Sequence, residues 1–124
     1  MNVPKSNRVA VIGSRGFDAY VFFSDKLEYL ISNLEGEIEF VSGGCKSGAD
    51  ALIKRYCEEK NIKLTEFLPD YNKYPGKVSP IKRNDEIVQY ATHLIAFYDG
   101  ASKGTGYTIK QAQKKGIPIK IITI

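Results

Sequence analysis

The sequence predicts a doubly wound α/β fold, in which one parallel sheet of about five strands, in the order 3-2-1-4-5, carries helices on both faces. Short apolar runs alternate along the 124 residues with longer segments of helical periodicity, which is the βαβ pattern. Glycine-rich turns follow the first, second and fourth apolar runs. With right-handed crossovers, these turns are expected at one edge of the sheet, outside the carboxyl ends of its strands.

The first half of the chain predicts two strands and one helix in order. Arg8–Ile12 is nearly all apolar, as is typical of a central parallel strand that is buried on both faces. From Asp18, apolar residues recur at helical spacing over about four turns, and Gly36 ends this helix. Glu37–Ser42 is the second strand.

The remaining elements follow from cap and breaker residues. Ser47 predicts an N-cap, and Asp50 stands where a capping box places its acidic partner. Pro80 favours a helix start. The predicted order is a helix from Ser47 to Asn61, a strand at 62–68, a long irregular stretch at 69–79, a helix from Pro80, a strand at 92–98, a helix at 105–115 closed by Gly116, and a strand at 117–124.

Composition indicates a single domain, residues 1–124, of ordinary globular character. Apolar residues make up 43% and charged residues 26%, and the net charge is +4. No apolar run is long enough to span a bilayer, and the start, Met1–Arg8, lacks the apolar region of a signal peptide. Two cysteines without a secretion signal are expected as free thiols. We therefore expect a cytoplasmic protein that makes no membrane contact.

Two of the glycine turns carry residues suited to an anionic ligand. In Gly13–Gly16, glycine lets backbone amides approach a ligand, and Arg15 offers a bidentate contact; the alternative is a tight turn with an exposed arginine. The turn at Gly43–Asp50 opens with two glycines and supplies Lys46, but it lacks the order of a P-loop. Asp50 is open to three interpretations: a helix cap, an acceptor for a ribose hydroxyl, or a general base.

The third turn, Asp99–Gly106, places Thr105 at a helix start, where a hydroxyl and free amides suit phosphate; the alternative is a capped surface turn. Asp99 ends a buried strand, where polar groups often face a ligand. Arg83 and Asn84 lie in a first helical turn, where the helix dipole disfavours a cation. Arg83 is therefore expected either to have a ligand or carboxylate partner or to be solvated.

Other conspicuous residues admit structural interpretations. Tyr71 and Tyr74 in the long loop either stack on a ring as a lid or anchor the loop. His93 has no second ligand at metal spacing, so no metal site is expected. Cys57 lies on an apolar helix face and is expected in the core. Cys45 begins near a helix start, but the sequence shows no base that would make it a nucleophile.

These motifs closely resemble small bacterial and phage members of the SLOG superfamily, the Rossmann-like group that contains the Smf/DprA and LOG proteins. The resemblance covers nearly the whole chain and keeps the order of the motifs GSRGF, SGGxxxGAD, PxxRN and DGxSxGT. The matching segments are Val11–Asp18, Ser42–Asp50, Pro80–Asn84 and Phe97–Gly100 with Gly104–Gly106.

The resemblance implies a nucleotide-type phosphorylated ligand, such as a nucleoside phosphate or an ADP-ribose- or NAD-like molecule, held by a sensor or carrier. No further cofactor is expected, and a homodimer is implied. The residues expected to contact the ligand are Gly13, Ser14, Arg15, Gly16, Phe17, Gly43, Gly44, Lys46, Gly48, Asp50, Arg83, Asn84, Asp99, Gly100, Lys103, Gly104, Thr105 and Gly106.

Two alternatives remain. The hydrolytic branch of the superfamily cleaves an N-glycosidic bond with an arginine and a glutamate, and Thr108 stands here at the glutamate position. An N-glycosidase or transferase would then need Asp50 or Asp99 as its carboxylate. The second alternative is single-stranded nucleic-acid binding, which a net charge of only +4 disfavours.

Overall fold

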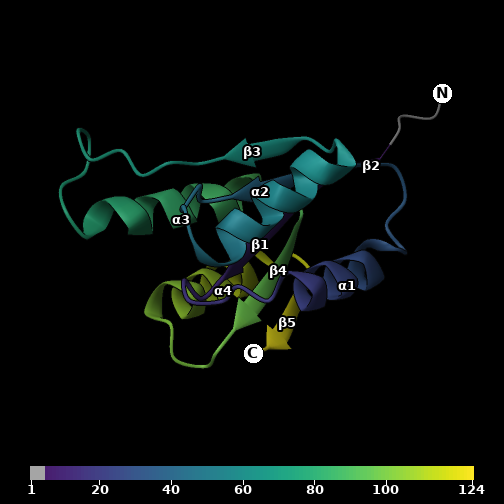
Figure 1. The fold of residues 1–124 in the computed structure, drawn as a ribbon. Helices are drawn as coiled ribbons and strands as arrows, with labels where there is room; N and C mark the ends of the chain where they lie inside the picture. Colours follow the sequence, from purple (N-terminus) through teal and green to yellow (C-terminus); the bar gives the residue numbers. More distant parts are fainter. Residues whose placement is uncertain (1–4) are drawn as a thin grey trace.

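Strands and helices alternate along the part of the chain that the structure, a computed structural model, describes, residues 5–124 (Figure 1). Residues 1–4, on which the expectation about a signal peptide partly rests, lie outside this range. The elements are β1 (Ser6–Gly13), α1 (Tyr20–Ile31), β2 (Glu37–Ser42), α2 (Gly48–Lys60), β3 (Leu64–Glu66), α3 (Val78–Tyr90), β4 (His93–Tyr98), α4 (Lys103–Lys115) and β5 (Ile119–Thr123).

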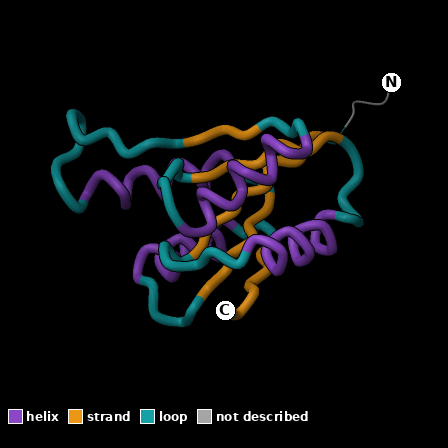
Figure 2. Tube along the Cα trace, viewed as in Figure 1, coloured by secondary structure: helices purple, strands orange, loops and turns teal. Residues whose placement is uncertain are grey.

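The five strands form one parallel sheet in the order β3-β2-β1-β4-β5, which confirms the predicted fold class and strand order. Figure 2 shows the strands in the middle of the molecule with helices around them. In the register, Val9 of β1 lies beside Phe40 of β2 on one side and His93 of β4 on the other. β2 and β3 thus lie on one side of β1, and β4 and β5 lie on the other. The place between β1 and β4, where the order of strands changes side, is the switch point at which open α/β sheets bind ligands.

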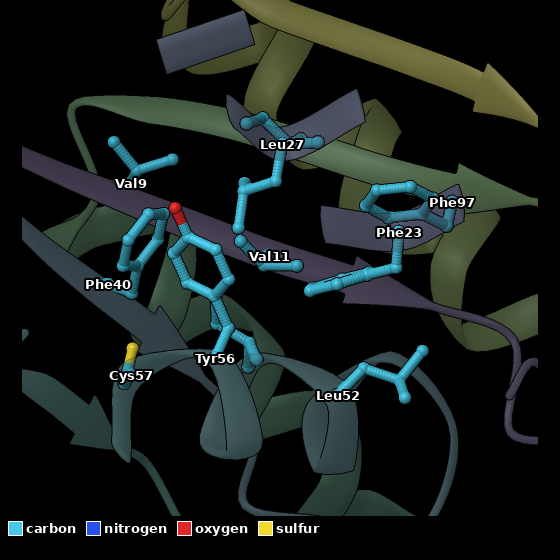
Figure 3. Packing of buried hydrophobic residues seen from close by; sticks show 11 residues of the cluster. Val9, Val11, Phe23, Leu27, Phe40, Leu52, Tyr56, Cys57 and Phe97 are labelled. Carbon is cyan, nitrogen blue, oxygen red and sulfur yellow. The ribbon is translucent and has the colours of Figure 1, made fainter. Parts of the chain in front are cut away.

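The core has two halves because side chains of a strand alternate between the faces of the sheet. Val9 and Val11 of β1 pack with α1 and α2, in a cluster that includes Phe23, Phe40 and Tyr56 (Figure 3). Ala10 and Ile12 of β1 face the opposite layer, which α3 and α4 form. Each large side chain buried in this way contributes about 1.5–3 kcal/mol. The apolar run Val9–Ile12 within β1 is thus explained by burial on both faces.

Some predicted boundaries are wrong for local reasons. The first helix ends at Ile31, before Gly36, and the hydroxyl of Ser32 donates a 2.7 Å bond to the carbonyl of Tyr29. Serine competes with the helix in this way. The third strand is shorter at both ends than the predicted 62–68, and it starts late because the amide of Ile62 donates to the carbonyl of Cys57 and closes the end of α2. The end of α2 itself is as predicted, with Asn61 in the left-handed conformation.

The last helices also start earlier than expected. α3 begins at Val78 and α4 at Lys103, so that Pro80 and Thr105 lie within first turns. Proline is tolerated there because the first-turn amides have no intrahelical partner. The last strand is shorter at both ends than the predicted 117–124. No helix within residues 5–124 is long and apolar enough to cross a membrane.

Candidate functional site

A pocket of ≈ 340 Å³ opens at the carboxyl edge of the sheet, where β1, β2 and β4 end. Its walls come from the end of β1, from the connections that follow these strands, from the first turns of α2 and α4, and from the part of α3 between Pro80 and Ile87. The volume falls in the range of small-molecule sites. The lining residues are Ile12, Gly13, Ser14, Arg15, Gly43, Cys45, Ser47, Asp50, Pro80, Arg83, Asn84, Ile87, Ser102, Lys103, Gly104, Thr105 and Thr108.

Asp50 holds the connection between β2 and α2. Its Oδ2 accepts a 3.0 Å hydrogen bond from the backbone amide of Cys45. Ser47 is the N-cap residue of α2, yet its side chain makes no cap bond, so the predicted capping box is wrong. The left-handed turn at Gly44 presents the Cys45 amide to the start of the helix, and Asp50 bonds to that amide instead. The N-terminus of α2 is left without a side-chain cap beside the pocket.

Arg83 is buried and is not a solvated arginine. Its Nη1 donates a 2.6 Å bond to the carbonyl of Gly43, and its Nε donates a 2.8 Å bond to Oδ1 of Asn84. A Cβ on Gly43 would lie 2.6 Å from that Nη1 and 3.1 Å from Oδ2 of Asp50. Glycine at position 43 therefore leaves the space into which the ends of Arg83 and Asp50 pack.

The pKa of Asp50 is raised from its ordinary value of 3.8, because burial disfavours the ionised carboxylate. The hydrogen bond from Cys45 and the charge of Arg83 act in the opposite direction and do not compensate. A carboxyl with a raised pKa at the wall of a pocket can accept a hydrogen bond from a ligand hydroxyl or exchange a proton with it.

The end of β1 and the connection after it contribute Gly13, Ser14 and Arg15 to the pocket. The connection lies directly against the start of α2: a Cβ on Gly48 would stand 2.5 Å from the carbonyl oxygen of Ser14 and 2.7 Å from Cα of Arg15. Gly48 also has φ +69, so its role is to let two connections approach. The hydroxyls of Ser14 and Ser102 share a 2.8 Å hydrogen bond, which ties this connection to the one after β4.

Asp99 organises the connection after β4. Its Oδ1 accepts 2.8 Å bonds from the amides of Ala101 and Ser102, and these bonds lower its pKa to about 2. The carboxylate is exposed and does not line the pocket. Ser102 is the N-cap residue of α4 but makes no side-chain cap bond to that helix. The N-terminus of α4, with Lys103 and Thr105, therefore faces the pocket uncapped.

Thr108 is buried and donates a 2.8 Å bond from its hydroxyl to the carbonyl of Gly104 one turn earlier in α4. Both residues line the pocket. Position 108, where the resemblance to the hydrolytic branch implied the site of a glutamate, thus carries a hydroxyl that is already bonded to the backbone.

The structure brings many of the predicted ligand residues to this pocket: Gly13, Ser14, Arg15, Gly43, Asp50, Arg83, Asn84, Lys103, Gly104 and Thr105. Others lie outside its lining: Gly16, Phe17, Gly44, Lys46, Gly48, Asp99, Gly100 and Gly106. Phe17 stacks on Phe97 of the core, 5.3 Å between ring centroids, and Lys46 is exposed to solvent.

Several lining residues were not predicted. Cys45, Ser47 and Ser102 lie inside the glycine turns, so the neighbouring glycines were the sequence signal that could have placed them at the pocket. Ile12 and Ile87 had no signal, because an apolar residue at a pocket wall has the same sequence pattern as one in the core.

The remaining singled-out residues lie away from the pocket or in the core. Neither Tyr71 nor Tyr74 lines it, and the ring of Tyr74 lies near two lysine ammonium groups, so the lid stays a prediction. His93 shares a 2.8 Å bond with Thr92. Cys57 is buried, which raises its pKa to about 12. Within residues 5–124, no group of three or more His, Cys, Asp or Glu side chains is placed to hold a metal.

Comparison with known proteins connects the chain to one family. The model of the family described as YAcAr, the YspA, cpYpsA-related SLOG family, matches residues 7–74. The Gene 61 protein of Mycobacterium phage D29 is 28% identical over 117 residues, which cover 90% of this chain and 93% of that protein. Among solved structures, S. aureus homoserine dehydrogenase aligns with a TM-score of 0.40 and 15% identity, over 96% of this chain and 33% of that enzyme. The chain thus spans about a third of that enzyme's length.

Proposed function

The chain belongs to the YspA, cpYpsA-related SLOG family, and on that premise we propose that its pocket binds a nucleotide-type phosphorylated small molecule, as a sensor or carrier. The observation that carries the proposal is that two helices without side-chain caps, α2 and α4, begin at one pocket. Free amides and the positive end of the helix dipole favour phosphate at such a place.

Charged side chains support the same ligand class. Arg15 and Lys103 line the pocket and are exposed to solvent. An anion can therefore bind to them without breaking a buried interaction of either side chain. Asp50, in the pocket wall, is suited to accept a hydrogen bond from a ribose hydroxyl. A ligand with an anionic group near Arg15 and Lys103 and a hydroxyl near Asp50 has the groups of a sugar phosphate, which every nucleotide contains.

The direct test is calorimetric titration of the purified protein with adenosine monophosphate, ADP-ribose, NAD and a cyclic dinucleotide, with adenosine as the unphosphorylated control. At least one phosphorylated compound should bind, and adenosine should bind at least tenfold more weakly, because a charged hydrogen bond contributes about 1.5–3 kcal/mol. Lys103→Ala should weaken the best ligand about tenfold, whereas Lys46→Ala, outside the pocket lining, should leave affinity within about twofold. Absence of binding across the panel would refute the proposal.

Hydrolysis of an N-glycosidic bond is the second candidate, and the raised pKa of Asp50 is the observation that favours it. A protonated carboxyl can donate to a leaving base. Release of free base from nucleoside monophosphates, measured by chromatography, should then be abolished in Asp50→Asn and kept in Asp99→Asn, whose carboxylate lies outside the pocket lining. Binding without base release supports the first candidate alone.

The cytoplasm remains the proposed location, because both cysteines are free thiols.

A further inference from the structure

The side-chain amide of Asn84, in the wall of the pocket, is held in one orientation. Its Oδ1 accepts a 2.8 Å hydrogen bond from Nε of Arg83. An arginine N–H can only donate, so the atom of the amide that faces it must be the oxygen. The NH₂ group of Asn84 is therefore turned away from Arg83.

Arg83 is itself anchored. Its side chain is 8% exposed, and its Nη1 donates a 2.6 Å bond to the carbonyl of Gly43. Because Nε is bound to Asn84, the guanidinium cannot offer Nε and Nη2 together as a bidentate pair for a phosphate. The contact that Arg83 makes at the pocket wall is thus the one that orients its neighbour.

The free donors of Asn84 lie against the start of α4. A Cβ on Gly104 would stand 3.9 Å from Nδ2 of Asn84. Thr105 follows in the same turn and is 7% exposed, yet its hydroxyl has no hydrogen-bond partner within residues 5–124 and is not enclosed by protein. Nδ2 of Asn84 likewise donates to no atom of those residues. All three residues line the pocket, so these polar groups face its interior.

The chemistry of this corner favours a group that accepts hydrogen bonds and donates none. An amide NH₂ can only donate, and the positive end of the α4 dipole favours negative charge. A phosphate or a carboxylate satisfies both, whereas a sugar hydroxyl brings a proton that Nδ2 cannot accept. The carboxyl of Asp50, which can accept that proton, belongs to α2.

We propose that Arg83 is a positioning residue, which holds the Asn84 amide so that its N–H donors and the Thr105 hydroxyl form a subsite for the anionic group of the ligand. Asn84 then selects an acceptor-only group at this corner, and Arg83 acts through Asn84 rather than on the ligand. The inference rests on the proposed function, since it takes the ligand to be anionic.

The orientation is tested first in the ligand-free protein, by NMR relaxation of the side-chain NH₂ groups. Asn7, whose Nδ2 donates to two carbonyls, is the rigid reference, and the exposed Asn72 is the mobile one. The NH₂ of Asn84 should match that of Asn7. In Arg83→Met it should become as mobile as that of Asn72, while Asn7 is unchanged. If Arg83→Met does not fold, Arg83→Lys, which keeps the charge but has no Nε, should have the same effect. An Asn84 amide that is already mobile in the wild type, or equally rigid without Arg83, would overturn the proposal.

The subsite is tested by titration with inorganic phosphate at about 1–50 mM, followed at the same NH₂ resonances. Phosphate should shift the Asn84 signals with a dissociation constant in the millimolar range. Asn84→Asp keeps an acceptor for Arg83 but replaces the donors with a carboxylate, so phosphate should bind at least about tenfold more weakly although the protein is as stable as the wild type. No shift at Asn84, or undiminished phosphate binding to Asn84→Asp, would refute the subsite.

A double-mutant cycle separates positioning from a general structural role. Arg83→Met should weaken phosphate binding in the wild type but cause no further loss in an Asn84→Ala background, because the group through which it acts is gone. A further loss in that background would mean that Arg83 acts by another route.

These outcomes are distinguishable from failure of the proposed function. If nucleotides bind equally well to the wild type and to Asn84→Asp, the proposed function stands and this inference fails. If phosphate shifts Asn84 as expected but no nucleotide binds, the inference stands and the nucleotide ligand is refuted.

Discussion

Replacing Gly43 with alanine should displace the Arg83 guanidinium and destabilise the protein. The backbone at Gly43 is not in the left-handed region, so the penalty comes from space alone. A Cβ there would lie 2.6 Å from Nη1 and 2.8 Å from Cζ of Arg83, about 1 Å inside normal van der Waals contact. Arg83 must then move away from the carbonyl to which it donates its 2.6 Å bond.

The magnitude follows from what Arg83 loses. The end of an arginine is flexible, so the backbone need not strain, and the cost is the charged hydrogen bond to the Gly43 carbonyl, about 1.5–3 kcal/mol. For a chain of this length, each 1 kcal/mol shifts the melting temperature by about 3–5 °C, so Gly43→Ala should melt about 5–15 °C below the wild type.

Thermal and urea unfolding of the wild type and its variants tests this reasoning. Gly16→Ala is the matched control, because a Cβ at Gly16 meets nothing within 4 Å and its φ is not positive; it should be neutral or stabilising by about 0.4–1 kcal/mol. In an Arg83→Met background, Gly43→Ala should cost less than half as much, because the clashing group is gone. Equal melting temperatures for the two glycine variants, or an unchanged cost in the Arg83→Met background, would refute the explanation.

Three further predictions concern charged groups. Lys115 donates bonds of 2.8, 2.6 and 2.9 Å to three carbonyls at the end of α3, so Lys115→Met should cost about 1–2 kcal/mol in urea unfolding, while Lys114→Met, its exposed neighbour, should cost less than about 0.5 kcal/mol; equal losses would contradict this. The pKa of Asp99 is lowered from 3.8 to about 2, so its charge stabilises the fold above pH 3.8 and this contribution disappears as the pH falls towards 2. Asp99→Asn should melt below the wild type at neutral pH and converge with it near pH 2; a gap independent of pH would count against the backbone bonds as its cause. The pKa of Asp50 is raised, so its ionisation opposes folding, and the melting temperature of the wild type minus that of Asp50→Asn should fall as the pH rises from about 4 to about 8; a rise would reverse the sign assigned to burial.

Most of the fold could be predicted from local patterns. The apolar run at β1 and the alternation of strand and helix predicted the parallel sheet, and the glycine turns after the first and fourth strands favoured the strand order that the structure has. Asn61 and Gly116 ended their helices as expected, because the left-handed conformation at a helix end is a property of one residue and its neighbours. The start of α4 was misplaced, because Asp99 bonds to the amides before the helix and shifts its first turn.

The pocket was only partly predictable. The three glycine turns marked the edge of the sheet where it lies. They did not distinguish a glycine that contacts a ligand from one that lets other parts of the chain pack closely, as Gly43 and Gly48 do. Lys46 was expected to contact a ligand because it belongs to a glycine motif, but membership of a motif does not determine which way a side chain points.

The sequence by itself determined the order of elements, the parallel sheet and the edge at which three glycine turns meet. These depend on periodicity and on the preferences of single residues, which are local properties of the chain. Only the tertiary structure decided that Arg83 bonds to the carbonyl of Gly43, 40 residues away in the sequence. Contacts between distant segments depend on the packing of whole elements, and no local pattern records them.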